Sequence, residues 1–267
     1  MRIPALSTRP APWGSAIFGA LLGLSLSLLI WAPARWLAWA VAQASQSQVQ
    51  LNDARGTVWA GSAQWVLSGG QGSRDPLALP GRFHWTLAPT WSGIRLGLRA
   101  DCCMTEAASI QVQAGLSTLN LQASDHRSQW PAALLTGLGA PWNTLRPDGQ
   151  LQLRTEGLQL HWSQGRARMK GQVELVVKDL SSRLSPIKPI GSYRIALNGT
   201  TEGTPTPGLQ LSTQQGPLLL SGQGQWVGTR LRFTGEARAQ EGQEGPLANL
   251  LNILGLRQGE RSLLSWG

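Results

Sequence analysis

The chain has 267 residues, a formal net charge of +9 and 14% charged residues, and 42% of its residues are hydrophobic, including 13 tryptophans. This apolar content excludes an intrinsically disordered chain, because it is enough to form a core. The positive charge does not indicate a nucleic-acid-binding protein, because the arginines after residue 42 are scattered singly and form no basic cluster. Anionic lipid headgroups or acidic proteins are the partners that this charge favours.

The N-terminal segment carries no charged residue between positions 10 and 34. An apolar run of this length predicts a transmembrane helix over 14–34, with tryptophans at the two membrane interfaces. Arg2 and Arg9 precede the run, and positive residues are retained on the cytoplasmic side of a membrane. We therefore expect residues 1–13 in the cytoplasm and the main domain in the periplasm, with the inner-membrane lipid as a partner of the anchor.

A cleaved signal peptide is the alternative for this segment, because Ala40–Ala42 has the small-x-small form of a cleavage site. The apolar run is longer than the usual core of a signal peptide, which favours a retained anchor. We expect residues 35–55 to be a linker and residues 56–267 to form a periplasmic β-rich domain.

From residue 56 onward, apolar and polar residues alternate with a period of two. Clear examples are Phe83–Leu87, Ile94–Arg99, Leu151–Arg154, Leu158–Trp162, Leu209–Ser212 and Leu231–Thr234. Such alternation places one face of a sheet against a core and the other face in water. The short spacing leaves no room for crossover helices, so we expect antiparallel strands and a mainly β fold.

Two stretches have helical character instead. Residues 131–138 predict a short helix or turn, and residues 246–254 have leucines at helical spacing before Gly255, a natural stop. The second helix is expected to cover an open edge or an end of the sheet. Its leucines, among them Leu250 and Leu254, suit a core, and a partner-binding face is the alternative.

Motifs for catalysis, metal binding or cofactor binding are missing from the sequence. The three histidines, His84, His126 and His161, are far apart, and there is no metal-ligand spacing, phosphate-binding loop or nucleophile elbow. Catalysis requires positioned acids, bases or nucleophiles. We therefore expect a protein that is not an enzyme and that has no catalytic residue, cofactor or metal.

Cys102 and Cys103 are the only cysteines and are adjacent. The periplasm is oxidising, which favours a disulfide between them. Adjacent residues in a regular strand point to opposite faces, so this bond requires a distorted turn. A vicinal disulfide and a pair of reduced or intermolecularly bonded thiols both remain open.

Residues 179–199 interrupt the alternation with Pro186 and Pro189 and continue to the only tyrosine, Tyr193. Proline cannot donate a hydrogen bond to a central strand ladder. We therefore expect residues 184–190 to be a structural loop or crossover between strands, with a docking loop as the alternative. Pro186, Pro189 and Tyr193, together with Leu250 and Leu254, are the candidate interaction surface.

Several stretches of the chain, in order, resemble one protein family. They are Gly56–Ala63, Pro80–Trp85, Leu145–Gly149, Asp179–Tyr193 and Leu250–Gly255, and together they resemble the type II secretion system protein N family. This resemblance implies a non-enzymatic accessory subunit of the inner-membrane assembly that exports folded proteins across the outer membrane, with other secretion subunits as partners. The family offers no catalytic residues to transfer.

A membrane-anchored lipid-binding or lipid-transfer module is the competing function. Most of the tryptophans after residue 56 are expected to fill the core face of the sheet. A concave apolar sheet face is also able to hold acyl chains, so the sequence leaves this alternative open.

Overall fold

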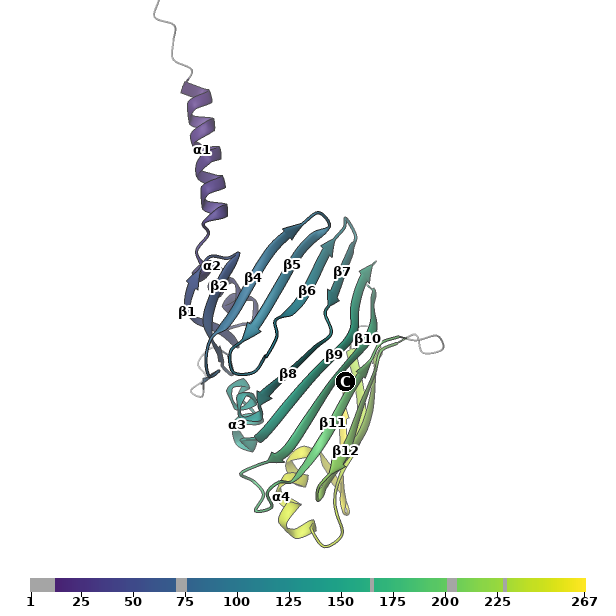
Figure 1. The fold of residues 1–267 in the computed structure, drawn as a ribbon. Helices are drawn as coiled ribbons and strands as arrows, with labels where there is room; N and C mark the ends of the chain where they lie inside the picture. Colours follow the sequence, from purple (N-terminus) through teal and green to yellow (C-terminus); the bar gives the residue numbers. More distant parts are fainter. Residues whose placement is uncertain (1–12, 71–75, 164–165, 201–205, 228–229) are drawn as a thin grey trace, which may run out of the picture.

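The chain folds into one large antiparallel sheet. The structure, a computed structural model, describes residues 13–70, 76–163, 166–200, 206–227 and 230–267. Its 16 strands form a single sheet that bends along its length, from β1 beside helix α2 at one end to the last strands beside helix α4 at the other (Figure 1). The prediction of a mainly β fold with antiparallel strands is confirmed.

The strands follow the chain almost in order across the sheet. They are β1 (Val49–Gly56), β2 (Ala60–Leu67), β3 (Leu77–Ala78), β4 (Phe83–Thr90), β5 (Gly93–Ala100), β6 (Ala108–Ala114), β7 (Thr118–Ala123), β8 (His126–Pro131), β9 (Asp148–Ser163), β10 (Arg166–Ser181), β11 (Gly191–Asn198), β12 (Gly208–Gln215), β13 (Leu218–Val227), β14 (Arg230–Ala239), β15 (Leu256–Gln258) and β16 (Arg261–Trp266). The strands β3 and β8 lie off the main path, paired with β2 and β9. Most connections therefore join neighbouring strands.

Five helices accompany the sheet within the residues that the structure describes. They are α1 (Trp13–Ile30), α2 (Ala34–Ala44), the 3₁₀ helix η1 (Ala132–Leu138), α3 (Trp142–Leu145) and α4 (Glu244–Leu254). The predicted helix at 246–254 is confirmed as α4, and the predicted helix or turn at 131–138 is η1. The strands β15 and β16, which follow α4, were not predicted.

The helix α1 projects away from the sheet (Figure 1), and its side chains from Ala16 to Ile30 are exposed. It ends before Pro33, whose extended backbone, with ψ of 144°, separates it from α2. Within the described part of the chain, no helix combines the length and the apolar character that a membrane crossing requires. The predicted transmembrane helix over 14–34 is therefore not confirmed.

Residues 35–55, which we expected to be a linker, contain most of α2 and β1. Ala34 at the start of α2 packs with Ala63 of β2 and Trp85 of β4 in a small core. The indole Nε1 of Trp85 also donates to the carbonyl oxygen of Val58 at 3.0 Å. The first helix-and-strand unit is thus attached to the sheet by packing and hydrogen bonding.

The two longest strands, β9 and β10, lie in the middle of the sheet and carry a bulge. The regular register breaks between Lys170 and Gln172, where Gly157 and Gly171 have positive φ angles of 56° and 85°. Leu153 and Leu160 are seven positions apart and would lie on opposite faces of a regular strand. The extra residue in β9 keeps them on the same face of the sheet. One apolar face therefore continues across the whole molecule.

Three small cores lie on this apolar face. The first is the one under α2. The second lies beside η1 and contains Leu79, Ala100, Cys103, Met104 and Leu134. The third and largest lies at the C-terminal end, where α4 and the loop after β10 cover the sheet; its buried members include Leu151, Val177, Ile190, Tyr193, Leu218, Leu247, Leu250 and Leu251. Stability is therefore distributed along the sheet.

Candidate functional site

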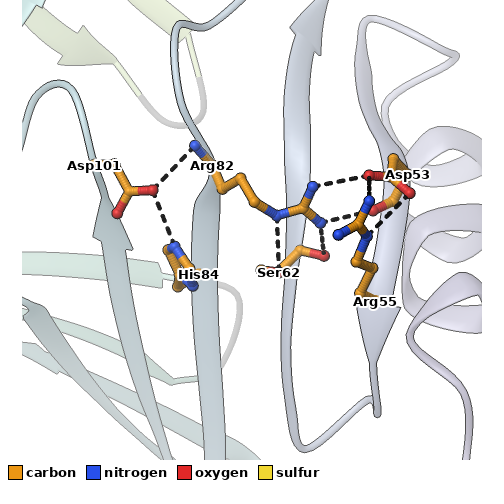
Figure 2. A network of polar contacts seen from close by, with 6 residues as sticks. All are labelled: Asp53, Arg55, Ser62, Arg82, His84 and Asp101. Carbon is orange, nitrogen blue, oxygen red and sulfur yellow. Dashed lines mark hydrogen bonds and ion pairs between the residues drawn. The ribbon is translucent and has the colours of Figure 1, made fainter.

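A polar network on the opposite face of the sheet connects the first strands, and Arg82 lies at its centre (Figure 2). Its Nε donates to the hydroxyl of Ser62 at 3.0 Å, and one terminal nitrogen donates to the carbonyl oxygen of Ser62 at 3.1 Å. The guanidinium also donates to the Asp53 carboxylate at 2.9 Å and to the Asp53 carbonyl oxygen at 2.8 Å. Arg82 thus joins β1, β2 and the start of β4.

The backbone of β1 explains why this bridge is needed. Asp53 has a positive φ of 49°, at a bulge where the register with β2 shifts between Asn52 and Arg55. Hydrogen bonds from Arg82 and then Arg55 lower the pKa of the Asp53 carboxyl. The ionised carboxylate and the two guanidinium groups therefore hold the bulge in place.

The network continues to a histidine and a second carboxylate. His84 Nε2 and Asp101 Oδ2 are 3.2 Å apart, and the backbone N–H of Arg82 donates to the same oxygen at 3.2 Å. The contact with His84, followed by this N–H, lowers the pKa of Asp101. The hydroxyl of Ser62 bonds to Arg82 and not to His84, so the arrangement links strands and does not activate a nucleophile.

This network is not apparent from the sequence. Its members come from the strands β1, β2 and β4 and from the turns before β4 and after β5, and the contacts that join Arg82 to β1 span 29 positions of the chain. No local pattern marks such partners.

The histidines show no sign of a metal site in the part of the chain that the structure describes. His161 hydrogen-bonds to Asn120 of the neighbouring strand β7, and His126 begins β8. Among the described residues, no cluster of three or more histidine, cysteine or acidic side chains is arranged to hold a metal ion.

Cys102 and Cys103 are disulfide-bonded to each other in the turn after β5. Cys103 belongs to the core beside η1, and its carbonyl oxygen accepts a hydrogen bond of 2.8 Å from the backbone N–H of Gln129. The turn therefore connects β5 to β8. The redox state of the pair in the cell stays a prediction, which alkylation without reduction, followed by mass spectrometry, measures.

The segment after β10 is a loop between neighbouring strands. We expected a loop or crossover at 184–190, and the loop is confirmed. Because β10 pairs directly with β11, this loop is a wide hairpin connection and not a crossover to a distant strand. The hydroxyl of Ser182 donates to the carbonyl oxygen of Leu145 at 2.6 Å and accepts from the N–H of Leu184 at 3.2 Å. Pro186 and Pro189 are exposed on this loop and remain available for contact.

Tyr193 is in the core and not on a surface. It is 2% exposed, and its hydroxyl donates to the carbonyl oxygens of Leu218, at 3.0 Å, and Ile190, at 3.3 Å. Burial raises the pKa of the phenol above its usual range. Its inclusion in the candidate interaction surface is therefore wrong.

The same correction applies to Leu250 of α4. Leu250 is 2% exposed, with Leu247 and Leu251 as buried neighbours, and Leu254 packs on the same core. These leucines fix α4 to the sheet and leave Pro186 and Pro189 as the exposed part of the predicted surface.

An exposed apolar surface lies elsewhere, in the middle of the sheet's apolar face. The helices pack on its margins: α2 on β1 and β2, η1 on β2, β3 and β9, and α4 on the strands from β14 to β16. Between them, Ile94 of β5, Leu119 of β7, and Leu160 and Trp162 of β9 are exposed. The alternation of apolar and polar residues in the sequence predicted an apolar face of the sheet. It did not predict which part of that face the helices leave exposed.

The polar face is hollowed over β12, β13 and β14 into a trough of about 1130 Å³, lined by residues such as Gln210, Gln223 and Gln225. Its lining combines hydrogen-bonding side-chain amides with apolar residues, among them Leu209, Leu211, Val227 and Leu263.

Comparison with known proteins places the chain in a family. No curated protein and no solved structure matches it. The model of the type II secretion system protein N family matches residues 47–264, a range that begins just before β1 and ends in β16. Members of this family are secretion components and are generally not enzymes. The chain belongs to the type II secretion system protein N family.

Proposed function

We propose that this protein is a non-enzymatic accessory subunit of the inner-membrane assembly of the type II secretion system, supporting export of folded proteins across the outer membrane. The observation that carries the proposal is the family match over residues 47–264, which covers almost the whole sheet. The structure adds an argument of its own. Its polar groups form a network that links strands, while Pro186, Pro189 and the apolar sheet face offer exposed contact surfaces.

We further propose that α1 anchors the protein in the inner membrane, with the N-terminus in the cytoplasm and the sheet in the periplasm. The support is the uncharged sequence from residue 10 to residue 34 and the exposure of the α1 side chains. Apolar side chains that no protein element covers are stabilised in hydrocarbon. A reporter that is active only in the periplasm, fused after Gly267, is expected to give signal.

Crosslinking in membranes tests the partners. A photo-crosslinking amino acid at Pro186 or Pro189 is expected to capture other subunits of the secretion assembly, identified by mass spectrometry. The matched control is the same label at Gly259, in the turn after β15. Capture of no secretion subunit from any exposed position, in cells that are actively secreting, contradicts the proposal.

Lipid binding is the second candidate function, and the exposed apolar side chains around Leu160 and Trp162 favour it. An acyl chain laid on this face would cover them. If this function is the correct one, the purified protein carries lipid that mass spectrometry detects, and Leu160→Asp reduces the amount. If the secretion assembly is its only partner, lipid content is the same in both variants.

A further inference from the structure

One edge of the sheet adjoins α1, and several turns share it. Alternate turns of an antiparallel sheet lie at the same edge. The turns β1–β2, β4–β5 and β6–β7 and the end of β16 therefore share one edge, which we call the helix-side edge. In Figure 1, α1 leaves the body at this edge, where the hairpins β4–β5 and β6–β7 also turn. The indole Nε1 of Trp59 in the β1–β2 turn donates to the carbonyl oxygen of Leu29 in α1 at 2.8 Å.

The tips of the two hairpins carry large apolar side chains in full exposure. Trp91 lies at the tip of β4–β5 and Leu116 at the tip of β6–β7, and both are fully exposed. At the same edge, Trp266 at the end of β16 is also exposed. Turns usually carry small or polar residues. Tryptophan and leucine at two adjacent tips therefore suggest that these side chains contact something other than water.

The tip with Trp91 is held in place by the neighbouring strand. The hydroxyl of Ser92 accepts hydrogen bonds from the amides of Gln111, at 3.3 Å, and Gln113, at 3.4 Å, both on β6. Gly93 has φ of 154°, and a Cβ there would lie 1.9 Å from the carbonyl oxygen of Val112. Only glycine permits this close approach. The exposure of Trp91 is thus a feature of an ordered turn.

Exposed arginines predominate near this edge in the part that the structure describes, and the carboxylate of Asp53 in β1 is paired with Arg55 and Arg82. Arg35, Arg95, Arg168 and Arg230 lie at or near this edge and are exposed. No described residue of its turns is acidic; Glu202 lies in 201–205, outside the described residues. The turns at the opposite edge contain acidic residues, for example Asp101, Glu106, Glu241 and Glu260.

We propose that the helix-side edge rests on the surface of an anionic lipid bilayer, with Trp91 and Leu116 inserted among the headgroups. Tryptophan favours this interface because its ring is apolar and its N–H is polar. Arginines nearby attract anionic lipids. A protein partner fits less well, because stable protein interfaces bury about 800 Å² on each side around a continuous core. The two tips are separate protrusions.

This inference rests on the proposed anchoring, because α1 in the membrane would bring the edge to its surface. The sheet would then stand with its opposite edge, including α4 and the loop with Pro186, directed into the periplasm. That orientation leaves this end free for other proteins.

The test uses the full-length protein in vesicles of phosphatidylethanolamine and phosphatidylglycerol. Trp91→Cys and Leu116→Cys are labelled with a fluorophore sensitive to polarity, under conditions that leave the Cys102–Cys103 disulfide intact. Quenching by nitroxide on the lipid headgroup is then measured. The matched control is Leu256→Cys, because Leu256 is 72% exposed but lies on β15, away from the helix-side edge. The chain without an added cysteine gives the background.

Quenching at positions 91 and 116 is expected to be about threefold greater than at position 256, and to fall when a zwitterionic lipid replaces phosphatidylglycerol. Equal quenching at the three positions overturns the inference. Fluorescence changes at 91 and 116 that depend on protein concentration in detergent, without lipid, identify a second copy as the occupant and also overturn it.

A label at Leu22→Cys in α1 separates this inference from the anchoring proposal. Quenching at position 22 by nitroxide placed on the acyl chains, without quenching at 91 and 116, leaves the anchor intact and rejects docking of the edge. Quenching at 91 and 116 without quenching at 22 supports docking and rejects the anchor. Absence of quenching everywhere rejects both.

Discussion

At the scale of single residues, Tyr193 shows how a polar group is used to close the core. Its ring lies in the apolar cluster, and its hydroxyl reaches the carbonyl oxygens of Leu218 and Ile190. The N–H of Leu218 in turn donates to the carbonyl oxygen of Ile190 at 3.0 Å. One side chain thus links the loop after β10 to the start of β13.

Tyr193→Phe is expected to lower the free energy of unfolding by about 1–3 kcal/mol, because two buried carbonyl oxygens lose a donor while the ring stays packed. Urea denaturation followed by tryptophan fluorescence measures this change. Since the hydroxyl is buried, export activity at moderate temperature should remain. Loss of export in a stable, correctly located Tyr193→Phe protein would instead restore Tyr193 to the interaction surface.

The two carboxylates of the polar network predict how stability depends on pH. The pKa values of Asp53 and Asp101 are lowered in the folded protein, so the folded state favours their ionised forms. Their contribution to stability is present above the ordinary carboxyl pKa of 3.8 and is lost as the pH falls through the lowered values. The protein is therefore expected to lose stability on acidification below about pH 4.

Asp53→Asn and Asp101→Asn are each expected to reduce stability at neutral pH and to weaken this acid dependence. Urea midpoints measured from neutral to acidic pH provide the comparison. Glu260→Gln, in an exposed turn outside the network, is the control and should follow the unsubstituted protein. An unchanged acid dependence in both aspartate variants contradicts the role of the network.

Whether a single residue is buried was less predictable than whether its segment forms a strand or a helix. Tyr193 and Leu250 look like surface candidates in the sequence, because one follows a proline-rich stretch and the other lies on an amphipathic helix. Which side of a strand or helix is covered depends on distant elements, here the loop after β10 and the sheet itself. The Arg82 network was not predicted for the same reason, because its members are brought together from distant parts of the chain.

At the scale of elements, alternation predicted strands well where one face is apolar. Residues 151–154 and 158–162 appeared as two strands because Gly157 interrupts the period, yet they are halves of β9. A bulge keeps the faces aligned while it shifts the parity of the sequence. The strands β15 and β16 are short and partly exposed, which gives too weak a pattern to identify.

The helix α4 provides a direct test of the distinction between core and surface. Leu250→Ala is expected to destabilise the protein by roughly 2–5 kcal/mol, because it leaves a cavity in the largest core. Ile253, on the same helix, is 47% exposed, and Ile253→Ala should change stability by less than about 0.5 kcal/mol. Thermal unfolding of the two variants measures the difference.

Export by the same variants separates stability from contact. If α4 only covers the sheet, Ile253→Ala exports normally and Leu250→Ala loses export in proportion to its loss of folded protein. Impaired export by a stable Ile253→Ala protein shows instead that the exposed side of α4 binds a partner. Removal of residues 246–267 should be more severe than either, because it also deletes the two strands that pair beyond β14.

At the scale of the whole molecule, the sequence predicted that the sheet has one apolar and one polar face. It did not predict the overall shape of the sheet. Alternating residues indicate that a sheet has one apolar face, but the order of strands follows from pairing between distant segments. The exposed hairpin tips are a similar case. Trp91 and Leu116 are unremarkable in the sequence and gain meaning only because both turns lie at the edge from which α1 emerges (Figure 1).

The position of α1 relative to the sheet leads to a prediction about export. The N–H of Val58 donates to the carbonyl oxygen of Ala32 at 2.8 Å, and Pro33 pairs with Thr57, so the junction after α1 is attached to the β1–β2 turn. The proposed anchoring would confine the sheet near its partners and raise their effective concentration. The attached junction additionally sets the orientation of the sheet.

Two variants distinguish confinement from orientation. A flexible glycine-serine insertion after Trp31 retains the anchor but disconnects the junction, whereas replacement of residues 1–30 by a cleavable signal sequence releases the sheet into the periplasm. In a host strain that lacks this gene, export of a folded cargo is expected to be reduced by the insertion and reduced further by the release, since both variants keep every strand. Normal export by both variants, equal to that of the unsubstituted protein, would show that neither the anchor nor the orientation of the sheet contributes. Restored export on overproduction of the released sheet would show that the anchor acts by raising the effective concentration of the sheet near its partners.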